Sequence, residues 1–145
     1  MDNNQVKWRS HSPVPIPNRS YASDCGYDLI VVGHHNVMPS VVTPLPCGLS
    51  VEFPDEAWGL IVGRSSARRD HGLFVHVAVI DAGFRGELFV DVTPIDGKAK
   101  HIEHGQRIGQ IIPLPTMALG WGGSTWVEAL SESDRGDKGF GSSGK

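Results

Sequence analysis

Residues Leu73–Val92 read LFVHVAVIDAGFRGELFVDV, and this stretch decides the fold class. Apolar side chains fall at alternate positions in its first half, and the alternation returns from Leu88 onward. A period of two residues is typical of a strand with one buried face. A turn near Ala82-Gly83 separates the two runs. We therefore expect an antiparallel β-hairpin with Asp81 at its tip.

Short apolar runs bounded by glycine and proline continue on both sides of this hairpin. The 18 glycines and 10 prolines are spread along the chain, which interrupts helices and favours short strands. One helix is expected at Ser65–Asp70, ending at Gly72. Alternate prolines from Pro13 to Pro17 make residues 1–20 an extended edge or arm. Further strands are expected at Tyr27–Val32, Val37–Leu49, Trp58–Val62, Arg107–Leu114 and Trp126–Leu130. The predicted fold is an all-β barrel or jelly roll with one short helix.

The composition of the chain changes near residue 130. Residues 131–145 are dominated by Ser, Gly, Asp and Lys, with Phe140 as their one aromatic side chain. Such a segment cannot bury enough apolar surface to become ordered by itself. We expect residues 1–130 to form the β-barrel domain and residues 131–145 to be a mobile C-terminal arm. Trp121 and Trp126 are expected to pack in the core or in an interface.

Charge and cysteine content exclude several functional classes. The chain has 145 residues and a net charge of -3, without the basic field of a nucleic-acid-binding domain. Cys25 and Cys47 are too few for a disulfide framework and suit a reducing compartment. No apolar leader and no run long enough to span a bilayer is visible. We expect a soluble cytoplasmic protein that binds neither membranes nor nucleic acids directly.

Two stretches place charged groups beside turns in the first half of the chain. Asp28 lies between Gly26 and an apolar run, where a solvated carboxylate is the usual interpretation. Arg64 and Ser65 stand where a strand meets the expected helix. Free backbone N–H groups there suit an anion, and arginine adds charge-assisted hydrogen bonds to phosphate. The alternative, that Ser65 only caps the helix, is equally favoured.

Three more stretches follow. Asp81 is either a turn residue stabilised by local hydrogen bonds or a base that activates water. Gln110 lies in a strand and faces either a ligand or, more usually, solvent. The segment Arg135–Gly144 combines glycines, an arginine, hydroxyls and one aromatic ring, which are the parts of a phosphate clamp with a stacking platform. A tail without function is the alternative.

In this order and at these separations, the five stretches resemble the five motifs of the trimeric dUTPases and span residues 26–144. The resemblance implies a jelly-roll-like β-barrel subunit and a homotrimer with three active sites at subunit boundaries. It implies Mg²⁺ as cofactor and hydrolysis of dUTP to dUMP and pyrophosphate, by attack of an activated water on the α-phosphorus. That activity would limit uracil incorporation into DNA and supply dUMP for dTMP synthesis.

The resemblance also implies roles for individual residues. Asp81 would be the catalytic residue that activates water, and Asp28 would hold Mg²⁺ through water. The implied substrate-binding residues are Arg64, Ser65, Ser66, Val75, Ala78, Phe84, Gln110, Arg135, Phe140, Gly141, Ser142 and Ser143. Phe140 would stack on uracil. The backbone of the expected hairpin from Val75 to Phe84 would read the base, because that segment has no Asn or Gln side chain.

The chain departs from the family's pattern at four positions. Phe84 stands where the family usually has tyrosine; the ring is kept, so discrimination against ribose should mostly survive. Ala78 and Ser66 each stand where a glycine is common, and Ala78 is expected to tighten the uracil pocket. Lys138 adds a positive charge to the phosphate-binding arm, and we assign it no role.

Two other functions compete with dUTP hydrolysis. The dCTP deaminases share the expected fold, and Gly63–Ser66 resembles their equivalent motif. They carry a glutamate on the second hairpin strand where this chain has Asp91. The complete fifth stretch and the spacing from Arg64 to Gly72 favour a dUTPase. Alternatively, the chain could be a binding module, because some phage members of the family regulate host proteins; the sequence identifies no such partner.

A histidine-based metal site is disfavoured. The pair His34-His35 and the residues His101 and His104 have no cysteine or acidic partner at the spacing of structural zinc sites.

Overall fold

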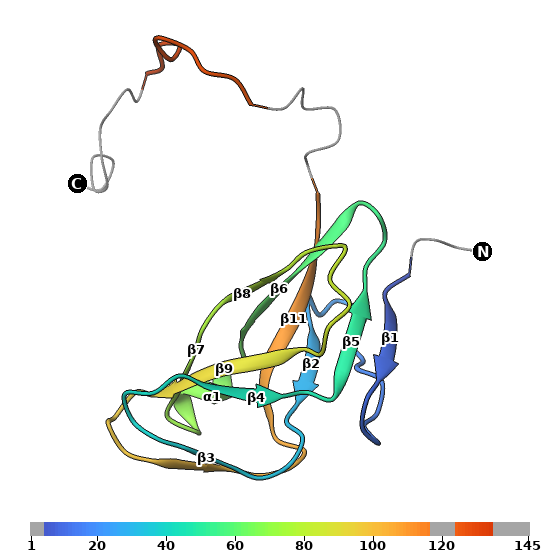
Figure 1. The fold of residues 1–145 in the computed structure, drawn as a ribbon, viewed down its shortest axis with the longest axis vertical. Coiled ribbons are helices and arrows are strands. Elements are labelled where there is room, and N and C mark those ends of the chain that lie inside the picture. The colour runs from blue at the N-terminus through green and yellow to red at the C-terminus, as the bar shows by residue number, and fades with distance from the viewer. Residues whose placement is uncertain (1–4, 117–123, 135–145) are drawn as a thin grey trace.

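The computed structural model describes residues 5–116 and 124–134. Figure 1 shows an elongated body of short strands with one small helix. The strands are β1 (Lys7–Ser10), β2 (Tyr27–Ile30), β3 (His35–Val37), β4 (Thr43–Pro46), β5 (Leu49–Glu52), β6 (Ala57–Gly63), β7 (Leu73–Val75), β8 (Ala78–Ile80), β9 (Phe89–Pro94), β10 (Lys100–Ile102) and β11 (Arg107–Pro115). The helix is α1 (Ser65–Arg69), between β6 and β7.

Two antiparallel sheets form the body of the subunit. The larger has the strand order β2-β11-β6-β8, and the smaller has the order β4-β9-β7. The two-stranded pairs β1-β5 and β3-β10 complete the body. Neighbours in a sheet come from distant parts of the sequence, as in a jelly roll. The expected fold class, all-β and jelly-roll-like with one short helix, is confirmed.

The core lies between the inward faces of the sheets. In β9 the expected alternation holds, because Val90 and Val92 are fully buried while Phe89 is 41% exposed. The core cluster consists of Leu29, Val31, Val37, Leu45, Cys47, Val51, Phe53, Ile61, Ala67, Leu73, Val75, Leu88, Val90, Val92, Ile102, Ile108 and Ile111. Burial raises the pKa of the Cys47 thiol to about 12, so this cysteine is an apolar core residue. Both cysteines are free thiols, as expected.

The expected hairpin is wrong in its first strand. β7 pairs with β9, with Val75 opposite Val92, but β8 leaves that sheet and pairs with β6. The buried face changes between β7 and β8. Val77 and Val79 are 64% and 61% exposed, while Ala78 packs on the core. A shift of one residue turns every following side chain to the opposite face. The loop after β8 therefore connects two sheets.

The helix lies where it was expected. α1 begins at Ser65 and ends at Arg69, and Gly72 then adopts the left-handed conformation with φ 62° that commonly ends helices. The N-terminal arm is an edge, because β1 pairs with β5 alone among the described strands. The region from Val37 to Leu49 was expected as one broken strand. It is divided into the end of β3, the whole of β4 and the start of β5. Pro39 lies in the first break, and Gly48, with φ 67°, lies in the second, while Pro44 and Pro46 are part of β4.

The strand expected at Trp126–Leu130 is wrong. Residues 124–134 contain no strand, and their side chains are exposed. Trp126 is 99% exposed, so it does not pack in the core of its own subunit. Trp121 lies outside the described residues. None of the helices in the described parts of the chain is long and apolar enough to cross a membrane.

Gly109 permits β11 to lie close to β9. A Cβ atom on Gly109 would lie 2.8 Å from Val90 Cγ2 and 3.1 Å from Val90 Cγ1. Valine is stiff at χ1, so this neighbour cannot yield easily. We expect Gly109→Ala to lower the free energy of unfolding by about 1–3 kcal/mol, the usual cost of overpacking. Denaturant titration at matched protein concentration measures this. Val90→Ala in the same background should restore part of the loss, and unchanged stability of Gly109→Ala would contradict the prediction.

Candidate active site

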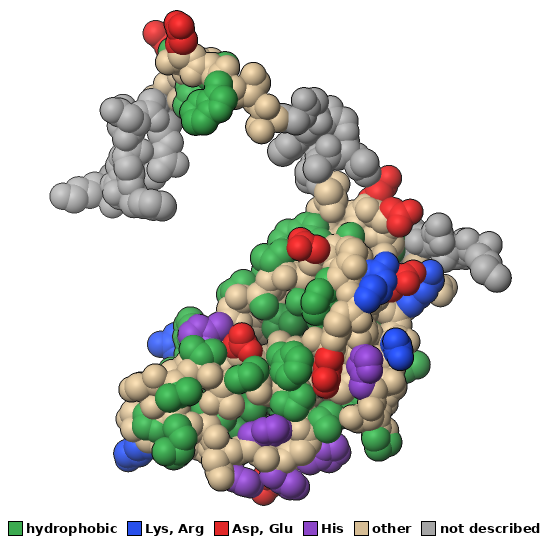
Figure 2. Space-filling model, in the orientation of Figure 1, with side chains coloured by type: hydrophobic (Ala, Val, Ile, Leu, Met, Phe, Trp, Pro, Cys, Tyr) green, Lys and Arg blue, Asp and Glu red, His purple; other side chains and the backbone are tan. Residues whose placement is uncertain are grey.

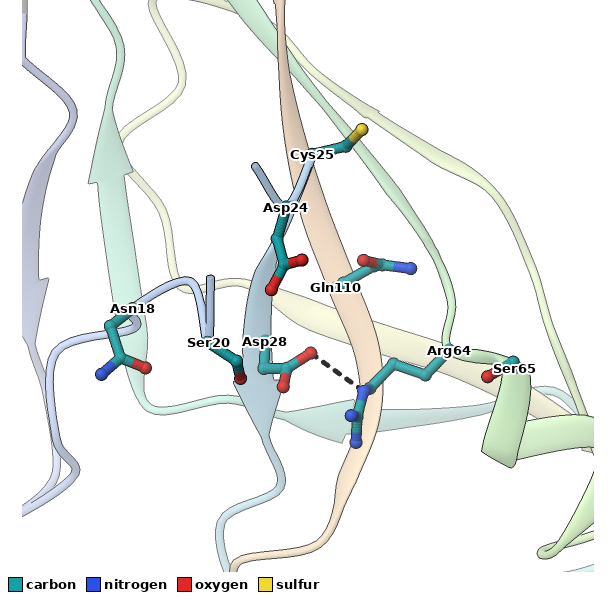
Figure 3. Close-up of a pocket in the computed structure, with 9 residues that line it drawn as sticks. Asn18, Ser20, Asp24, Cys25, Asp28, Arg64, Ser65 and Gln110 are labelled. Carbon is teal, nitrogen blue, oxygen red and sulfur yellow. Dashed lines mark ion pairs between the residues drawn. The ribbon is translucent and has the colours of Figure 1, made fainter. Parts of the chain in front are cut away.

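A polar notch opens beside the junction of β6 and α1. It has a volume of about 260 Å³. Its walls come from the segment before β2, from β2 itself, from the middle of β11 and from the start of α1 (Figure 3). The lining residues are Asn18, Ser20, Asp24, Cys25, Gly26, Asp28, Arg64, Ser65 and Gln110. Of the sequence-predicted residues, the structure brings together Asp28, Arg64, Ser65 and Gln110.

Sheet register brings three of these side chains together. Gln110 on β11 lies opposite Asp28 on one side and opposite Val62 on the other. Directly opposite residues in an antiparallel pair project from the same face. Two residues beyond Val62 the chain leaves β6, which places Arg64 beside the same face. Asp28 and Gln110, which are 82 positions apart in the chain, therefore line one notch.

Gln110 faces the notch, not open solvent. A Cβ on Gly26 would lie 2.7 Å from Gln110 Oε1, so the amide lies directly over the Gly26 backbone. Gln110 Nε2 is 3.5 Å from the Gly63 carbonyl oxygen, at the limit of a hydrogen bond. The amide is thus weakly held and available to a ligand, and a side chain at position 26 would collide with it.

Arg64 forms an ion pair across the notch. Its Nε lies 2.9 Å from Asp28 Oδ1, with side-chain exposures of 34% and 20% (Figure 3). The Arg64 backbone N–H donates to the Ile108 carbonyl at 3.0 Å, and its Nη1 lies 3.4 Å from the Arg107 carbonyl oxygen. These contacts hold a guanidinium at the mouth of the notch, where it can turn from Asp28 to an incoming phosphate.

Ser65 is not the helix cap that one interpretation proposed. The N-cap position of α1 is Arg64, with φ -74° and ψ 154°, and no side chain caps the helix. Ser65 is the first helical residue, is exposed and lines the notch. Ser66 is half-buried and is not among the lining residues. Its carbonyl oxygen accepts hydrogen bonds from the N–H groups of Asp70 and His71, so its backbone closes the helix.

The notch has hydrogen-bond donors for an anion and oxygen ligands for a hard cation. Arg64 and Ser65 supply hydrogen-bond donors to phosphate oxygens. Carboxylate oxygens of Asp24 and Asp28 suit Mg²⁺, which usually keeps several waters and takes one or two carboxylates together with phosphate oxygens. Among the described residues no three His, Cys, Asp or Glu side chains form a metal cage. The residues therefore fit Mg²⁺ held through water and phosphate, not a structural metal.

Sequence analysis missed four lining residues: Asn18, Ser20, Asp24 and Cys25. They belong to the polar segment between the prolines of the arm and β2. The signal was a second carboxylate four residues before Asp28, in a run whose only apolar residues are Tyr21, Ala22 and Cys25. Asp24 Oδ2 accepts the Tyr21 backbone N–H at 2.9 Å, and this bond shapes the segment into a turn over the notch.

The third predicted stretch, which contains Asp81, lies away from the notch. Asp81 follows β8, whose Ile80 pairs with Gly59 near the start of β6, while Arg64 follows the end of β6. Arg64 is five residue steps along the chain from Gly59, or about 17 Å at 3.3–3.4 Å per residue. Asp81 is exposed and does not line the notch of its own subunit.

The other predicted residues of that stretch differ in exposure. Phe84 is 41% exposed, and its ring lies over the backbone of Gly86, where a Cβ would come within 2.6 Å of Phe84 Cζ. The side chain of Val75 is buried against Gly63, and Ala78 is half-buried. Arg135, Phe140, Gly141, Ser142 and Ser143, and also Lys138, lie outside the described residues.

Some of the histidine side chains gather at the end of the molecule where β3 lies, and others are scattered over the rest of this face (Figure 2). The rings of His34 and His101 stack with centroids 6.0 Å apart. The Gly33 N–H donates to His104 Nδ1 at 3.0 Å, and His35 Nε2 lies 2.7 Å from the Val32 carbonyl oxygen. The ring nitrogens of His35 and His104 therefore have local hydrogen-bond partners.

The jelly-roll fold and the notch define a class: all-β subunits with an arginine, a carboxylate and an amide arranged for a phosphorylated ligand at a strand–helix junction. The dUTPase family model matches residues 12–144. The chain belongs to the dUTPase family.

Relatives of known name support the assignment. The deoxyuridine 5'-triphosphate nucleotidohydrolase of Tropheryma whipplei (strain Twist) is 33% identical over 132 residues, covering 89% of this chain and 88% of that protein. The one from Rhodococcus erythropolis (strain PR4 / NBRC 100887) is 33% identical over 138 residues, covering 90% and 80%. Among solved structures, the Staphylococcus bacteriophage 80alpha dUTPase with dUPNHPP superposes with a TM-score of 0.85 at 26% identity, covering 98% and 99% of the two chains.

Proposed function

We propose that the chain hydrolyses dUTP to dUMP and pyrophosphate. The observation that carries this proposal is the notch, in which Arg64, Asp28 and Gln110 converge in a chain of the dUTPase family. In the cytoplasm, this activity would limit uracil incorporation into DNA and supply dUMP for dTMP synthesis.

In the proposed mechanism each residue has a separate task. Arg64, Ser65 and Gln110 bind phosphate oxygens and orient the α-phosphorus. Asp81 accepts a proton from the attacking water, and pyrophosphate leaves on the opposite side. Asp28 would hold Mg²⁺ through water, and the bound ion would supply charge neutralisation on the phosphate oxygens. Such reactions depend mainly on positioning and charge neutralisation, so this set of groups is sufficient.

The active site requires more than one subunit. Because Asp81 follows the end of β8 that pairs with Gly59, about 17 Å along β6 from Arg64, Asp81 serves the notch of a neighbouring copy. The exposed side chains of Phe74 on β7, of Val79 on β8 and of Val77 between these strands provide apolar surface for contact between subunits. We propose the homotrimer of the family. Sedimentation should give three times 15.7 kDa; an active monomer would refute it.

The base is recognised by the backbone around β8. Among the described strands β8 pairs only with β6, so its outer edge has free N–H and C=O groups. Uracil has one donor flanked by two acceptors, which an extended backbone can match. The side chain of Val75 is buried, so this residue can contribute to base recognition only through its main-chain groups. Ala78 lies on β8 and narrows the space available for the base.

The C-terminal arm completes the proposed site. We propose that residues 1–130 form the barrel domain and that residues 131–145 form a mobile arm. Arg135, Gly141, Ser142 and Ser143 bind phosphate oxygens, and Phe140 stacks on uracil. Closure of this arm would exclude all water except the attacking molecule.

A product assay tests the function. Purified protein is incubated with Mg²⁺ and dUTP, dCTP, dTTP or UTP, and pyrophosphate and ammonia are measured. We expect pyrophosphate from dUTP, and far less from the other nucleotides, because unpaired polar groups in the base pocket penalise the wrong base. Ammonia from dCTP would instead identify a deaminase. Equal rates with dUTP and dTTP would contradict base recognition by the β8 backbone.

Asp28 should control the Mg²⁺ requirement. Asp28→Asn removes the charge that holds the metal-bound waters, so the Mg²⁺ concentration for half-maximal rate should rise about tenfold or more. Magnesium titration of the dUTP reaction measures this. Asp96→Asn, which removes a distant surface carboxylate paired with Lys100, is the control and should leave the titration unchanged. Identical titrations for Asp28→Asn and the wild type would contradict the assignment.

A further inference from the structure

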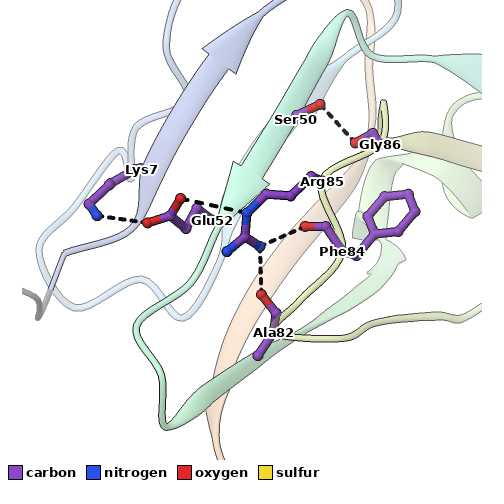
Figure 4. Close-up of polar contacts among 7 residues, drawn as sticks. All are labelled: Lys7, Ser50, Glu52, Ala82, Phe84, Arg85 and Gly86. Carbon is purple, nitrogen blue, oxygen red and sulfur yellow. Dashed lines mark hydrogen bonds and ion pairs between the residues drawn. The ribbon is translucent and has the colours of Figure 1, made fainter.

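The loop after β8 is internally tied by Arg85. Its Nη1 donates to the Ala82 carbonyl at 2.7 Å and to the Phe84 carbonyl at 2.9 Å (Figure 4). One guanidinium thus joins both ends of the short turn that follows Asp81. The Phe84 N–H also donates to the Asp81 carbonyl at 3.0 Å, so the turn and the carboxylate-bearing residue move together.

Side chains from β5 and β1 orient this guanidinium. Arg85 Nε lies 3.6 Å from Glu52 Oε2 on β5, and Glu52 Oε1 lies 2.7 Å from Lys7 Nζ on β1 (Figure 4). Lys7 and Glu52 are directly opposite in the register of β1 and β5. Lysine and arginine side chains and acidic groups gather over this edge in Figure 2. The series Lys7–Glu52–Arg85 therefore connects the N-terminal strand to the loop.

The hydrogen bond from Lys7, and then the charges of Lys7 and Arg85, hold the pKa of Glu52 below its usual value. The carboxylate is therefore ionised above that pKa, and its pairing with Arg85 weakens as the pH falls through it. At neutral pH the tie is intact.

Packing alone does not hold this turn. Asp81, Gly83, Phe84 and Arg85 are all exposed. A Cβ on Gly83 would meet nothing within 4 Å. A glycine in open space has wide conformational freedom, so contacts made by neighbouring side chains must restrict the turn.

The end of the loop has anchors of its own. The Ser50 hydroxyl donates to the Gly86 carbonyl at 2.8 Å (Figure 4). The Leu88 N–H donates to the Leu49 carbonyl, also at 2.8 Å. These bonds fix the loop where it enters β9. Arg85 is the side chain that extends this anchoring back to the turn beside Asp81.

We propose that Arg85, oriented by Glu52, is a positioning residue that fixes the turn carrying Asp81 and Phe84 in the geometry required at the neighbouring subunit's notch. The proposal rests on the proposed function. Arginine is needed because it can bond two carbonyl oxygens while its Nε faces a carboxylate. Lysine at this position keeps the positive charge but lacks the planar, forked set of N–H donors of a guanidinium.

Steady-state kinetics with dUTP test the proposal in Arg85→Lys, Arg85→Met and Glu52→Gln. Displacing a reacting group by about 1 Å can cost up to 100-fold in rate. Because the loop is exposed, we expect a loss of about tenfold in kcat for Arg85→Met, with KM within about threefold. Arg85→Lys should lose nearly as much as Arg85→Met, and Glu52→Gln should lose less. The double variant of Glu52→Gln with Arg85→Met should be no slower than Arg85→Met alone, because both changes remove one tie.

Lys100→Met is the control, because Lys100 Nζ also forms an ion pair with a carboxylate, that of Asp96 at 2.6 Å, in the connection between β9 and β10 and not in the loop after β8. It should keep the wild-type kcat. Wild-type kcat in Arg85→Met, Arg85→Lys and Glu52→Gln would overturn the proposal, as would a loss confined to KM. If Arg85→Met does not fold, Arg85→Lys, which keeps the charge, decides alone. No pyrophosphate from dUTP with the wild-type protein would instead refute the proposed function.

Discussion

Replacing Asp81 by asparagine should lower kcat for dUTP by about 100-fold or more, with nearly unchanged affinity for a non-hydrolysable dUTP analogue. Asparagine keeps the size of the side chain but cannot accept the proton of the attacking water. Positioned proton transfer typically contributes 10²–10⁴-fold to a rate. The phosphate-binding groups of Arg64, Ser65 and Gln110 are untouched, so binding should persist. Rapid-quench turnover and titration calorimetry measure the two quantities.

Mixing variants tests where the Asp81 side chain acts. Subunits with Asp81→Asn have an intact notch, and subunits with Arg64→Met have an intact Asp81. Each variant alone should be nearly inactive. Refolded together, they should regain activity, because a notch from one subunit then meets Asp81 from another. If no activity returns although mixed oligomers form, Asp81 and the notch act within one subunit, contrary to the spacing along β6. Near-normal turnover of Asp81→Asn alone would show that another group activates water.

Removing residues 135–145 should lower kcat/KM for dUTP by at least about 100-fold. Loss of a single preorganised donor to developing charge can cost 10²–10³-fold. The truncation removes Arg135, Ser142 and Ser143, together with the stacking ring of Phe140. Thermal unfolding and the sedimentation mass should stay close to those of the full chain, because the core consists of residues 29–111.

A shorter deletion controls for the truncation. Removing Lys145 alone leaves the fifth stretch complete and should leave turnover unchanged. Normal turnover after removal of residues 135–145 would mean that the arm takes no part in the site and that its resemblance to the fifth motif carries no function.

Local pattern predicted most of the secondary structure. Alternation of apolar residues predicted β9, and the glycine at position 72 predicted where α1 ends. Both signals depend on residues close in sequence, so one segment contains the whole of each. The same reasoning was wrong for Trp126–Leu130, where a short apolar run has β propensity but the structure gives it no partner strand. It was also wrong for the continuity of Leu73–Ile80, because alternation does not specify the sheet that a strand joins.

The candidate residues divide in the same way. The sequence by itself determined the all-β class and the chemical identity of Asp28, Arg64, Asp81 and Gln110, because turn and strand signals and side-chain chemistry are local. Only the tertiary structure decided that three of them meet in one notch while Asp81 lies at the far end of β6. The register between distant strands decides which of these residues meet in the notch. That register depends on contacts between segments tens of residues apart. The tie from Lys7 through Glu52 to Arg85 has the same origin, since neither a motif nor a period links positions 7, 52 and 85.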